Sequence, residues 1–200
     1  MKKHLSVLAV IFVTTAILSG CGGSPTTSSQ SPQAQSQKAA EKPSVKTYKP
    51  GQYKVGADLP AGEYVAIADG NGYIEIAKNS TGTLDSILAN DLFQNRSIIS
   101  VSDGQFLKIQ KCVLYALKDA PKVKDVGGFL PPGMYKVGVD LPAGEYKIIS
   151  EAQNSYIETS RTSRHTLDDI IANDLFQGDK YVNVSNGQYV KFVGAKIKVK

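Results

Sequence analysis

YKVGADLPAGEY, at residues 53–64, returns with a single substitution as YKVGVDLPAGEY at residues 135–146. In both stretches the Leu-Pro-Ala-Gly segment suits a type I turn, because proline fits position i+1 and glycine fits position i+3. The turn separates two short runs with the composition of β-strands. Each stretch therefore predicts a strand, a tight turn and the start of a second strand.

The two stretches belong to a longer internal repeat. Further matches follow in the same order, first at an offset of 82 residues and then of 83, so the second copy contains one inserted residue. Roughly half of the aligned positions are identical, which indicates a duplication. We therefore expect a first copy at 49–118, a linker at 119–130 and a second copy at 131–200. The other matched segments are 73–75 with 156–158, 89–94 with 172–177, and 104–105 with 187–188.

The pattern within each copy is mostly that of strands. Alternating and β-branched residues predict many short strands, which favours a mainly β fold: two tandem small β-sandwich or partly open barrel modules. Units of this size fold alone only marginally. The further strands are expected at 63–68, 73–78, 97–101 and 105–117, with counterparts at 145–150, 156–160, 180–184 and 188–199.

Each copy is also expected to contain one short helix. Thr83 and Thr166 are suitable N-cap residues. Leu84, Ile87 and Leu88 follow at helical spacing, as do their counterparts Leu167, Ile170 and Ile171. Asn90-Asp91 and Asn173-Asp174 tolerate the left-handed conformation in which a helix can end.

The last predicted strand differs between the copies. The second copy ends with alternating lysines at 196–200, whereas the equivalent segment 113–117 is apolar on both faces. A strand of that kind needs cover on both sides. We therefore predict that the outer face of 113–117 is buried against the second copy or the linker.

The first residues have the composition of an export signal. Lys2, Lys3 and His4 precede an almost wholly apolar run at 5–18, which is shorter than the roughly 18–20 residues of a membrane-spanning helix. Leu18-Ser19-Gly20-Cys21 resembles the lipobox of bacterial lipoproteins. The resemblance implies a signal peptide at 1–20, cleavage before Cys21, and lipidation of Cys21 with a diacylglycerol. Several acyl chains give stable anchoring in a lipid bilayer.

Residues 21–48 are rich in Ser, Gln, Ala, Pro and Thr and have almost no large apolar side chains. Such a segment cannot bury enough surface to fold, so we expect a disordered tether. Removal of Lys2 and Lys3 with the signal would lower the formal net charge from +5 to +3. An exported chain without basic clusters interleaved with aromatics is not expected to bind nucleic acid.

The repeated motif resembles a small module of exported proteins from low-GC Gram-positive bacteria. The resemblance covers both copies, from about residue 50 to residue 200. It implies a small β-rich module on the extracytoplasmic face of the cell membrane, and it implies no particular activity.

The sequence contains few residues suited to catalysis. His165 is the one histidine beyond the signal, it replaces Gly82 of the first copy, and it lies in a polar run that indicates a solvated loop. Cys112 corresponds to Ala195, which favours a buried packing position over a nucleophile. Walker, HExxH and nucleophile-elbow patterns are absent. We expect no catalytic residue, no metal and no cofactor.

Five pairs of carboxylates recur in the two copies. Paired acids could serve a hydrolase or a calcium site. Asp58 and Glu63 flank the Pro-Gly turn, however, and Asp85 suits the first turn of the expected helix. We therefore favour structural roles. The pairs are Asp58/Asp140, Glu63/Glu145, Glu75/Glu158, Asp85/Asp168 and Asp91/Asp174.

The best candidate for contact with a ligand is an aromatic residue beside a carboxylate. Alternation places Tyr73 and Glu75 on one face of a strand and Ile74 on the other, and Tyr156 and Glu158 repeat this pair. Tyrosine can stack on a sugar while glutamate accepts its hydroxyls. Tyrosine is also a common strand residue without any function.

Three functions fit these observations. The first is a lipid-anchored, non-enzymatic binding module for a cell-wall polymer, a peptide or another envelope protein, in which two weak sites on one chain would gain avidity. The second is a structural spacer without a ligand. The third, a hydrolase that uses the repeated acids, has less support.

Overall fold

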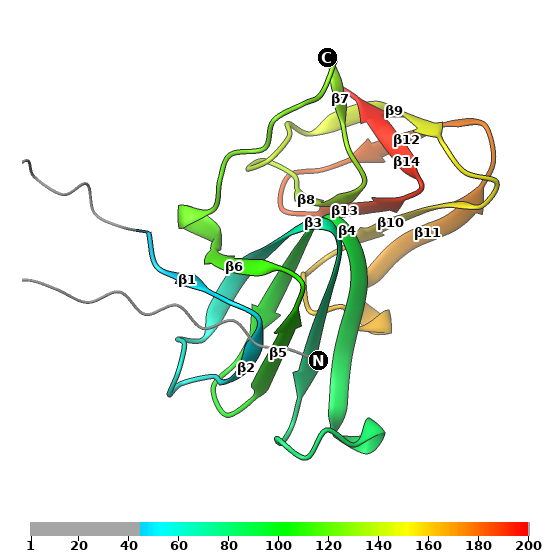
Figure 1. Ribbon diagram of the computed structural model, residues 1–200. Helices are drawn as coiled ribbons and strands as arrows, with labels where there is room; N and C mark the ends of the chain where they lie inside the picture. The colour runs from blue at the N-terminus through cyan, green and yellow to red at the C-terminus, as the bar shows by residue number, and fades with distance from the viewer. Residues whose placement is uncertain (1–44, 200) are drawn as a thin grey trace, which may run out of the picture. The chain divides into compact units, whose positions relative to one another are not determined.

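The structure is a computed structural model that describes residues 45–199 (Figure 1). These residues lie in one compact unit, Lys42–Lys200. The expected signal peptide, Cys21 and nearly all of the expected tether lie outside the described residues. The predicted mainly β class is confirmed, because strands make up most of the described chain and the helices are single 3-10 turns.

The first copy forms one curled sheet with the strand order β1-β6-β3-β5-β2, and β4 pairs with β3. Strand β1 lies within the stretch that the sequence assigned to the tether. The elements are β1 (Thr47–Tyr48), β2 (Gly51–Lys54), β3 (Gly62–Ala77), η1 (Leu84–Ser86), β4 (Ile87–Val101), β5 (Phe106–Gln110), β6 (Val113–Ala116) and η2 (Leu117–Asp119).

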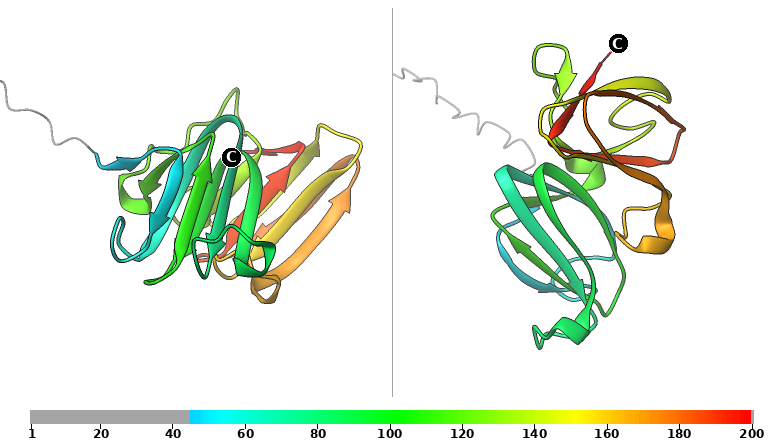
Figure 2. Two further views of the ribbon diagram at one scale, coloured as in Figure 1. Left: turned by 60° about the horizontal axis from the view of Figure 1, so that its bottom comes forward. Right: turned by 90° about the vertical axis from the view of Figure 1, so that its right-hand side faces the viewer.

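The second copy forms two four-stranded sheets, ordered β11-β10-β13-β8 and β12-β9-β14-β7. Figure 2 shows β11, in orange, as the outermost strand of this half. The elements are β7 (Phe129–Leu130), β8 (Gly133–Lys136), β9 (Gly144–Ser150), β10 (Ser155–Ser160), η3 (Leu167–Asp169), β11 (Ile170–Phe176), β12 (Asp179–Val184), β13 (Tyr189–Val193) and β14 (Ala195–Lys198).

The copies share their strand pairings but differ in continuity. Strand β3 pairs with β6 through residues 64–67 and with β5 through residues 73–77, with a register shift between Ile67 and Asn71. In the second copy these two halves are separate strands, β9 and β10, joined by the exposed residues 151–154. The inserted residue lies at this connection, so the second copy turns where the first continues as one long hairpin.

The expected helices were wrong beyond their first turn. Thr83 and Thr166 are the N-caps, but η1 and η3 end after three residues and strands β4 and β11 follow at once. In β4 the side chains of Ala89, Asp91 and Phe93 are buried, while Leu88 and Leu92 are exposed. This period of two fits pairing with β3, and the leucines that suggested a helix face solvent instead of a core.

The repeated motif is held by local hydrogen bonds. Asp58 Oδ2 accepts a bond of 2.7 Å from the backbone N–H of Lys54, and the Tyr64 hydroxyl donates at 2.7 Å to the carbonyl of Pro60. The same bonds recur in the second copy, from Lys136 N–H to Asp140 and from Tyr146 to Pro142. The motif therefore fixes its own turn, and Asp58 and Asp140 have structural roles there.

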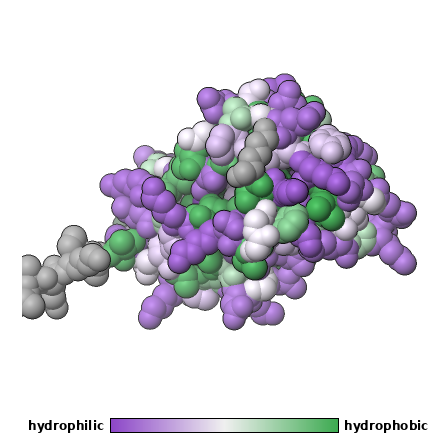
Figure 3. Space-filling view, turned by 90° about the horizontal axis from the view of Figure 1, so that it is seen from above, coloured by the Kyte–Doolittle hydropathy of each residue, from purple (hydrophilic) through white to green (hydrophobic). Residues whose placement is uncertain are grey.

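Each copy has a separate apolar core, and a third apolar cluster joins them. The first core includes Ile74 and Leu107, and the second includes Ile148 and Phe192. The third is formed by Val65, Ile98, Met134 and Tyr189, with Ile67, Leu117 and Ala120 packed against it. Hydrophilic side chains dominate the face in Figure 3, with apolar ones in several small patches.

The segment 113–117 is covered as predicted only in part. Leu114 is fully buried in the first core, whereas Val113, Tyr115 and Leu117 on the outer side are half-buried. Of these, Leu117 packs against the cluster that contains Met134 and Tyr189 of the second copy. The strand itself ends at Ala116, and its edge pairs with β1.

Candidate functional site

The predicted Tyr–Glu pairs are formed in both copies. The hydroxyl of Tyr73 donates to Glu75 Oε2 at 2.6 Å, and Tyr156 donates to Glu158 Oε2 at 2.7 Å. The opposite faces point inward as expected, with Ile74 in the first core and Ile157 in the second. The tyrosines are half-buried, and Glu75 is buried, so the pairs are less exposed than the alternation suggested.

Burial raises the pKa values of both tyrosines, Tyr73 and Tyr156, and it raises the pKa of Tyr156 to about 12. Both hydroxyls are protonated at neutral pH, as at the ordinary pKa of 10, and donate to the carboxylates. In the first copy Lys108 Nζ lies 4.0 Å from Glu75 Oε2 and 6.0 Å from the centre of the Tyr73 ring. This lysine adds a positive charge beside the pair.

Tyr73 lines a surface pocket of about 360 Å³ together with Leu92, two amide side chains and Lys111. A second pocket of about 270 Å³ shares Gln110 and Lys111 with the first and continues past Lys108 to residues 50–52. The two pockets lie over β4, β3, β5 and β2 and share two lining residues, and we call them together the tyrosine groove. Its lining combines an aromatic ring, amides and two lysines.

The second copy lacks the basic part of this groove. Gln110 and Lys111 correspond to Val193 and Gly194, and the remaining lysine, Lys191, lies 2.5 Å from Asp91 of the first copy. The Tyr–Glu–Asn part recurs, since Asn90 and Asn173 both donate to the tyrosine hydroxyls. The two copies therefore do not present equivalent sites, which removes the support that the duplication gave to avidity.

Asp91 joins the copies through a buried polar network. Its side chain is 2% exposed and accepts a hydrogen bond of 2.7 Å from Ser97 besides the contact with Lys191. His165 Nδ1 lies 3.8 Å from the same carboxylate, and His165 Nε2 is 2.8 Å from the carbonyl of Ile98. The predicted solvated loop position of His165 was wrong, because this side chain is 5% exposed. Burial lowers its pKa.

Glu63 forms a second polar contact between the copies. Lys136 Nζ lies 2.6 Å from Glu63 Oε2, and the hydroxyls of Tyr189 and Ser163 donate to Glu63 Oε1. The position of Glu63 beside the Pro-Gly turn had suggested a merely local role. Its counterpart Glu145 is exposed, so this use of the residue follows from the packing of the two copies.

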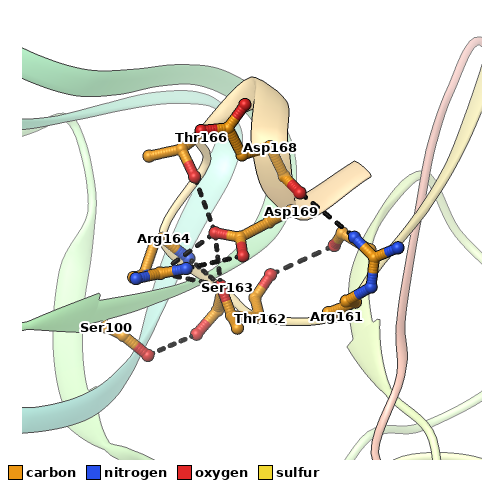
Figure 4. Close-up of polar contacts among 9 residues, drawn as sticks. Ser100, Arg161, Thr162, Ser163, Arg164, Thr166, Asp168 and Asp169 are labelled. Carbon is orange, nitrogen blue, oxygen red and sulfur yellow. Dashed lines mark hydrogen bonds and ion pairs between the residues drawn. The ribbon is translucent and has the colours of Figure 1, made fainter. Parts of the chain in front are cut away.

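The loop at 161–169 docks on the first copy. Asp169 accepts hydrogen bonds from Thr162 at 2.7 Å, Thr166 at 2.6 Å and Arg164 at 2.7 Å (Figure 4). The Arg164 guanidinium holds the pKa of Asp169 well below its usual range. The loop, stabilised in this way, places Ser163 Oγ 2.7 Å from Ser100 Oγ.

The contact between the two copies could have been recognised by comparing their sequences position by position. Four of its residues differ in polarity from their counterparts: Val65 from Lys147, Arg96 from Asp179, Ile98 from Tyr181 and Met134 from Gln52. Arg96 lies 2.8 Å from Asp140, whereas Lys147 and Asp179 pair with each other. A position that is apolar in one copy and charged in the other indicates a surface that is buried between the copies in the first case and faces solvent in the second.

The other candidates have the following surroundings. Cys112 is buried in the first core, and burial raises the pKa of its thiol, as suits a packing position. Within residues 45–199, no cluster of three or more His, Cys, Asp or Glu side chains is arranged to hold a metal ion. No helix of the described part is long and apolar enough to cross a membrane.

Comparisons of the chain with models of protein families, with curated proteins and with solved structures found no match.

Proposed function

We propose that this protein is a lipid-anchored, extracytoplasmic binding protein that is not an enzyme, and that its tyrosine groove binds an anionic cell-wall polymer. Anchoring would follow from the lipobox-like Leu18-Ser19-Gly20-Cys21 at the end of the apolar N-terminal run. The observation that carries the binding role is the groove itself, in which Tyr73 stands between amide side chains and lysines.

The chemistry of the groove favours a hydroxyl-rich polymer with negative charges. The face of the Tyr73 ring suits a sugar or polyol, and Asn71 and Gln110 offer both donors and acceptors. Lys108 and Lys111 supply positive charge within the groove. Phosphate or carboxylate groups along a polymer would meet these ammonium groups, and each such exposed contact would weaken with salt.

The experiment is co-sedimentation of residues 42–200, the compact unit, with isolated cell-wall sacculi and with purified wall polymers across a salt series. We expect retention that persists at moderate salt and falls at least several-fold in Tyr73→Ala. Tyr156→Ala, the equivalent change in the copy without the lysines, is the matched control and should have a small effect. Retention that vanishes at moderate salt, or that is equal in the two variants, would refute binding in the groove.

Lys111→Gly sharpens this test. Lys111 has a φ of 55°, and its counterpart Gly194 has a φ of 64°, so glycine fits this backbone. The variant should lose binding without losing stability, which a thermal melt of the same sample checks. A loss of binding in this variant cannot then be ascribed to unfolding.

A structural spacer remains the second candidate. It is favoured by the extent of polar and apolar contact between the copies, in which Glu63 and Asp91 are used for packing. A spacer would show no retention by any wall fraction and would tolerate Tyr73→Ala and Tyr156→Ala together.

A further inference from the structure

Strand β11 leaves one edge of a sheet open. It stands at the end of the order β11-β10-β13-β8 and pairs only with β10 in that sheet. Figures 1 and 2 both show it as the outermost strand of the second copy. Residues 171–175 are all exposed, including the apolar Ile171 and Leu175.

This edge carries few of the features that usually prevent strand pairing. Proteins protect such edges with prolines, lysines, bulges or a covering segment. The strand Ile170–Phe176 contains no proline and no lysine, and its single charge, Asp174, already pairs with Lys180. A register shift in its pairing with β10 leaves Ile171 as an extra residue near the start of the strand, because Thr159 pairs with Ala172 and Ser160 with Ile170.

The equivalent strand of the first copy is covered. Asp91 of β4 is buried beside Lys191, whereas its counterpart Asp174 is exposed. Strand β8 lies so close to β4 that a Cβ on Gly133 would be 3.0 Å from the carbonyl oxygen of Arg96. The sequence Ala-Asn-Asp-Leu-Phe thus occurs twice, once against the second copy and once at an open edge.

The sequence of β11 is complementary to itself in the antiparallel direction. With Asn173 on a two-fold axis, Ile171 lies opposite Leu175 of the other strand, and Ala172 lies opposite Asp174. Each pairing of Ile171 with Leu175 would bring two exposed apolar side chains together, and the two Asn173 amides could bond to each other. No like charges lie directly opposite one another in this register.

We propose that two copies of this chain associate through antiparallel pairing of β11 with β11 of the second chain. The contact is isologous, so it closes after two chains. It would join two four-stranded sheets into one. The interface is small, so the association should be weak and depend on concentration. Anchoring of many chains in one membrane would raise the effective concentration.

A cysteine on the two-fold axis tests the pairing. Directly opposed residues of antiparallel strands have Cα atoms about 4.5–5.5 Å apart, which a disulfide can bridge. In the whole chain with Cys112→Ala, which copies Ala195, we expect Asn173→Cys to form a covalent dimer under mild oxidation. The matched control is Asn90→Cys at the equivalent position of β4, which should give several-fold less dimer.

A second substitution excludes random collision as the explanation. Adding Leu175→Lys should reduce the Asn173→Cys dimer several-fold, because a lysine on each strand opposes Ile171 of the other and charges the edge. Leu92→Lys, the same change on β4, should leave the amount of dimer unchanged. Equal cross-linking at residues 173 and 90, or insensitivity to Leu175→Lys, would overturn the proposal, as would a monomer at every concentration in sedimentation.

Discussion

At the scale of single residues, equivalent positions have different roles in the two copies. Asp91 is buried between Lys191 and Ser97, whereas Asp174 is exposed beside Lys180. His165 is packed against the carbonyl of Ile98, whereas Gly82 in the first copy has no such contact within 4 Å of its Cβ position. The surroundings decide what each residue contributes to stability.

Asp91→Asn should therefore be strongly destabilising. Loss of the carboxylate leaves Lys191, which is 15% exposed, without its counter-charge, and breaking a buried pair typically costs about 3–5 kcal/mol of unfolding free energy. Asp174→Asn removes an exposed pair worth roughly 0–1 kcal/mol. Urea denaturation of residues 42–200 compares the two. Equal effects would show that the Asp91 contact does not stabilise the fold.

His165 should make stability depend on pH in a defined window. Burial lowers its pKa below the ordinary value of 6.5, while the nearby Asp91 and Glu158 oppose and Lys191 reinforces this shift. As the pH falls below 6.5 the unfolded chain takes up a proton that the folded chain does not, so stability decreases. Above that pH this contribution is fully present.

His165→Asn removes the titration, and asparagine tolerates the φ of 58° at this position. We expect unfolding free energies measured between pH 5 and 8 to fall on the acid side in the natural chain and to change less in the variant. Residues 42–200 contain no other histidine, so the difference reports this one group. Parallel curves would contradict the assignment.

At the scale of elements, the long hairpin of β3 and β4 is the feature that distinguishes the first copy. Gly72 lies opposite Phe93, and a Cβ at Gly72 would be 2.4 Å from the ring carbon Cζ of that buried side chain. The second copy has Ser155 at this position, where its hydroxyl donates to the carbonyl of Gly194. The glycine is therefore needed only where the hairpin continues.

Gly72→Ala should cost about 1–3 kcal/mol of stability, the usual penalty for overpacking a core. A smaller partner should relieve the clash, so Gly72→Ala combined with Phe93→Leu should cost less than the sum of the two single changes. Denaturant melts of the three variants measure this coupling. Strict additivity would mean that the ring and the glycine do not interact.

Elements were predicted well where the pattern was local. The strands on either side of each Pro-Gly segment and the N-cap threonines were visible in the sequence. The hydrogen-bonded turn was not, because it lies at 56–58, before the Pro-Gly segment in which it was predicted. The helix after Thr83 was wrong beyond its first turn because burial in 88–93 alternates with a period of two, with Leu88 and Leu92 exposed and Ala89 buried. Pairing with β3 decided between these conformations, and that pairing is a long-range contact.

At the scale of the molecule, the apolar cluster and the two polar networks unite the copies. Val65 and Met134 are buried in the cluster, and their counterparts Lys147 and Gln52 are polar. The surfaces that contain Lys147 and Gln52 are therefore too polar to form the same contact. A further copy would not pack there as the two copies pack on each other.

Val65→Lys together with Met134→Gln gives each residue its counterpart from the other copy. A lysine in an apolar cluster lacks a partner, so we expect the contact to loosen and the single unfolding transition to divide into two. The reverse exchanges, Lys147→Val and Gln52→Met, change exposed surfaces and should leave one transition. Differential scanning calorimetry distinguishes these outcomes, and a single transition in the first variant would contradict the expected coupling.

The candidate site could be predicted only in part. Alternation correctly paired Tyr73 with Glu75 and Tyr156 with Glu158, because neighbours two apart on a strand share a face. The sequence did not show that Lys111 and Leu92 meet Tyr73, since these residues come from two strands and the connection between β5 and β6. The sequence also did not show that Lys191 of the second copy pairs with Asp91 of the first copy.

The mainly β class and the inward faces of the strands could be predicted from the residues alone, because they depend on backbone preferences and on alternation within a few residues. Which copy of each repeated residue is buried depends on the packing of the two copies. The nearly identical segments 87–93 of β4 and 170–176 of β11 have different surroundings because a duplicated chain can cover one of its equivalent edges with its own second half. The other edge has no such segment to cover it.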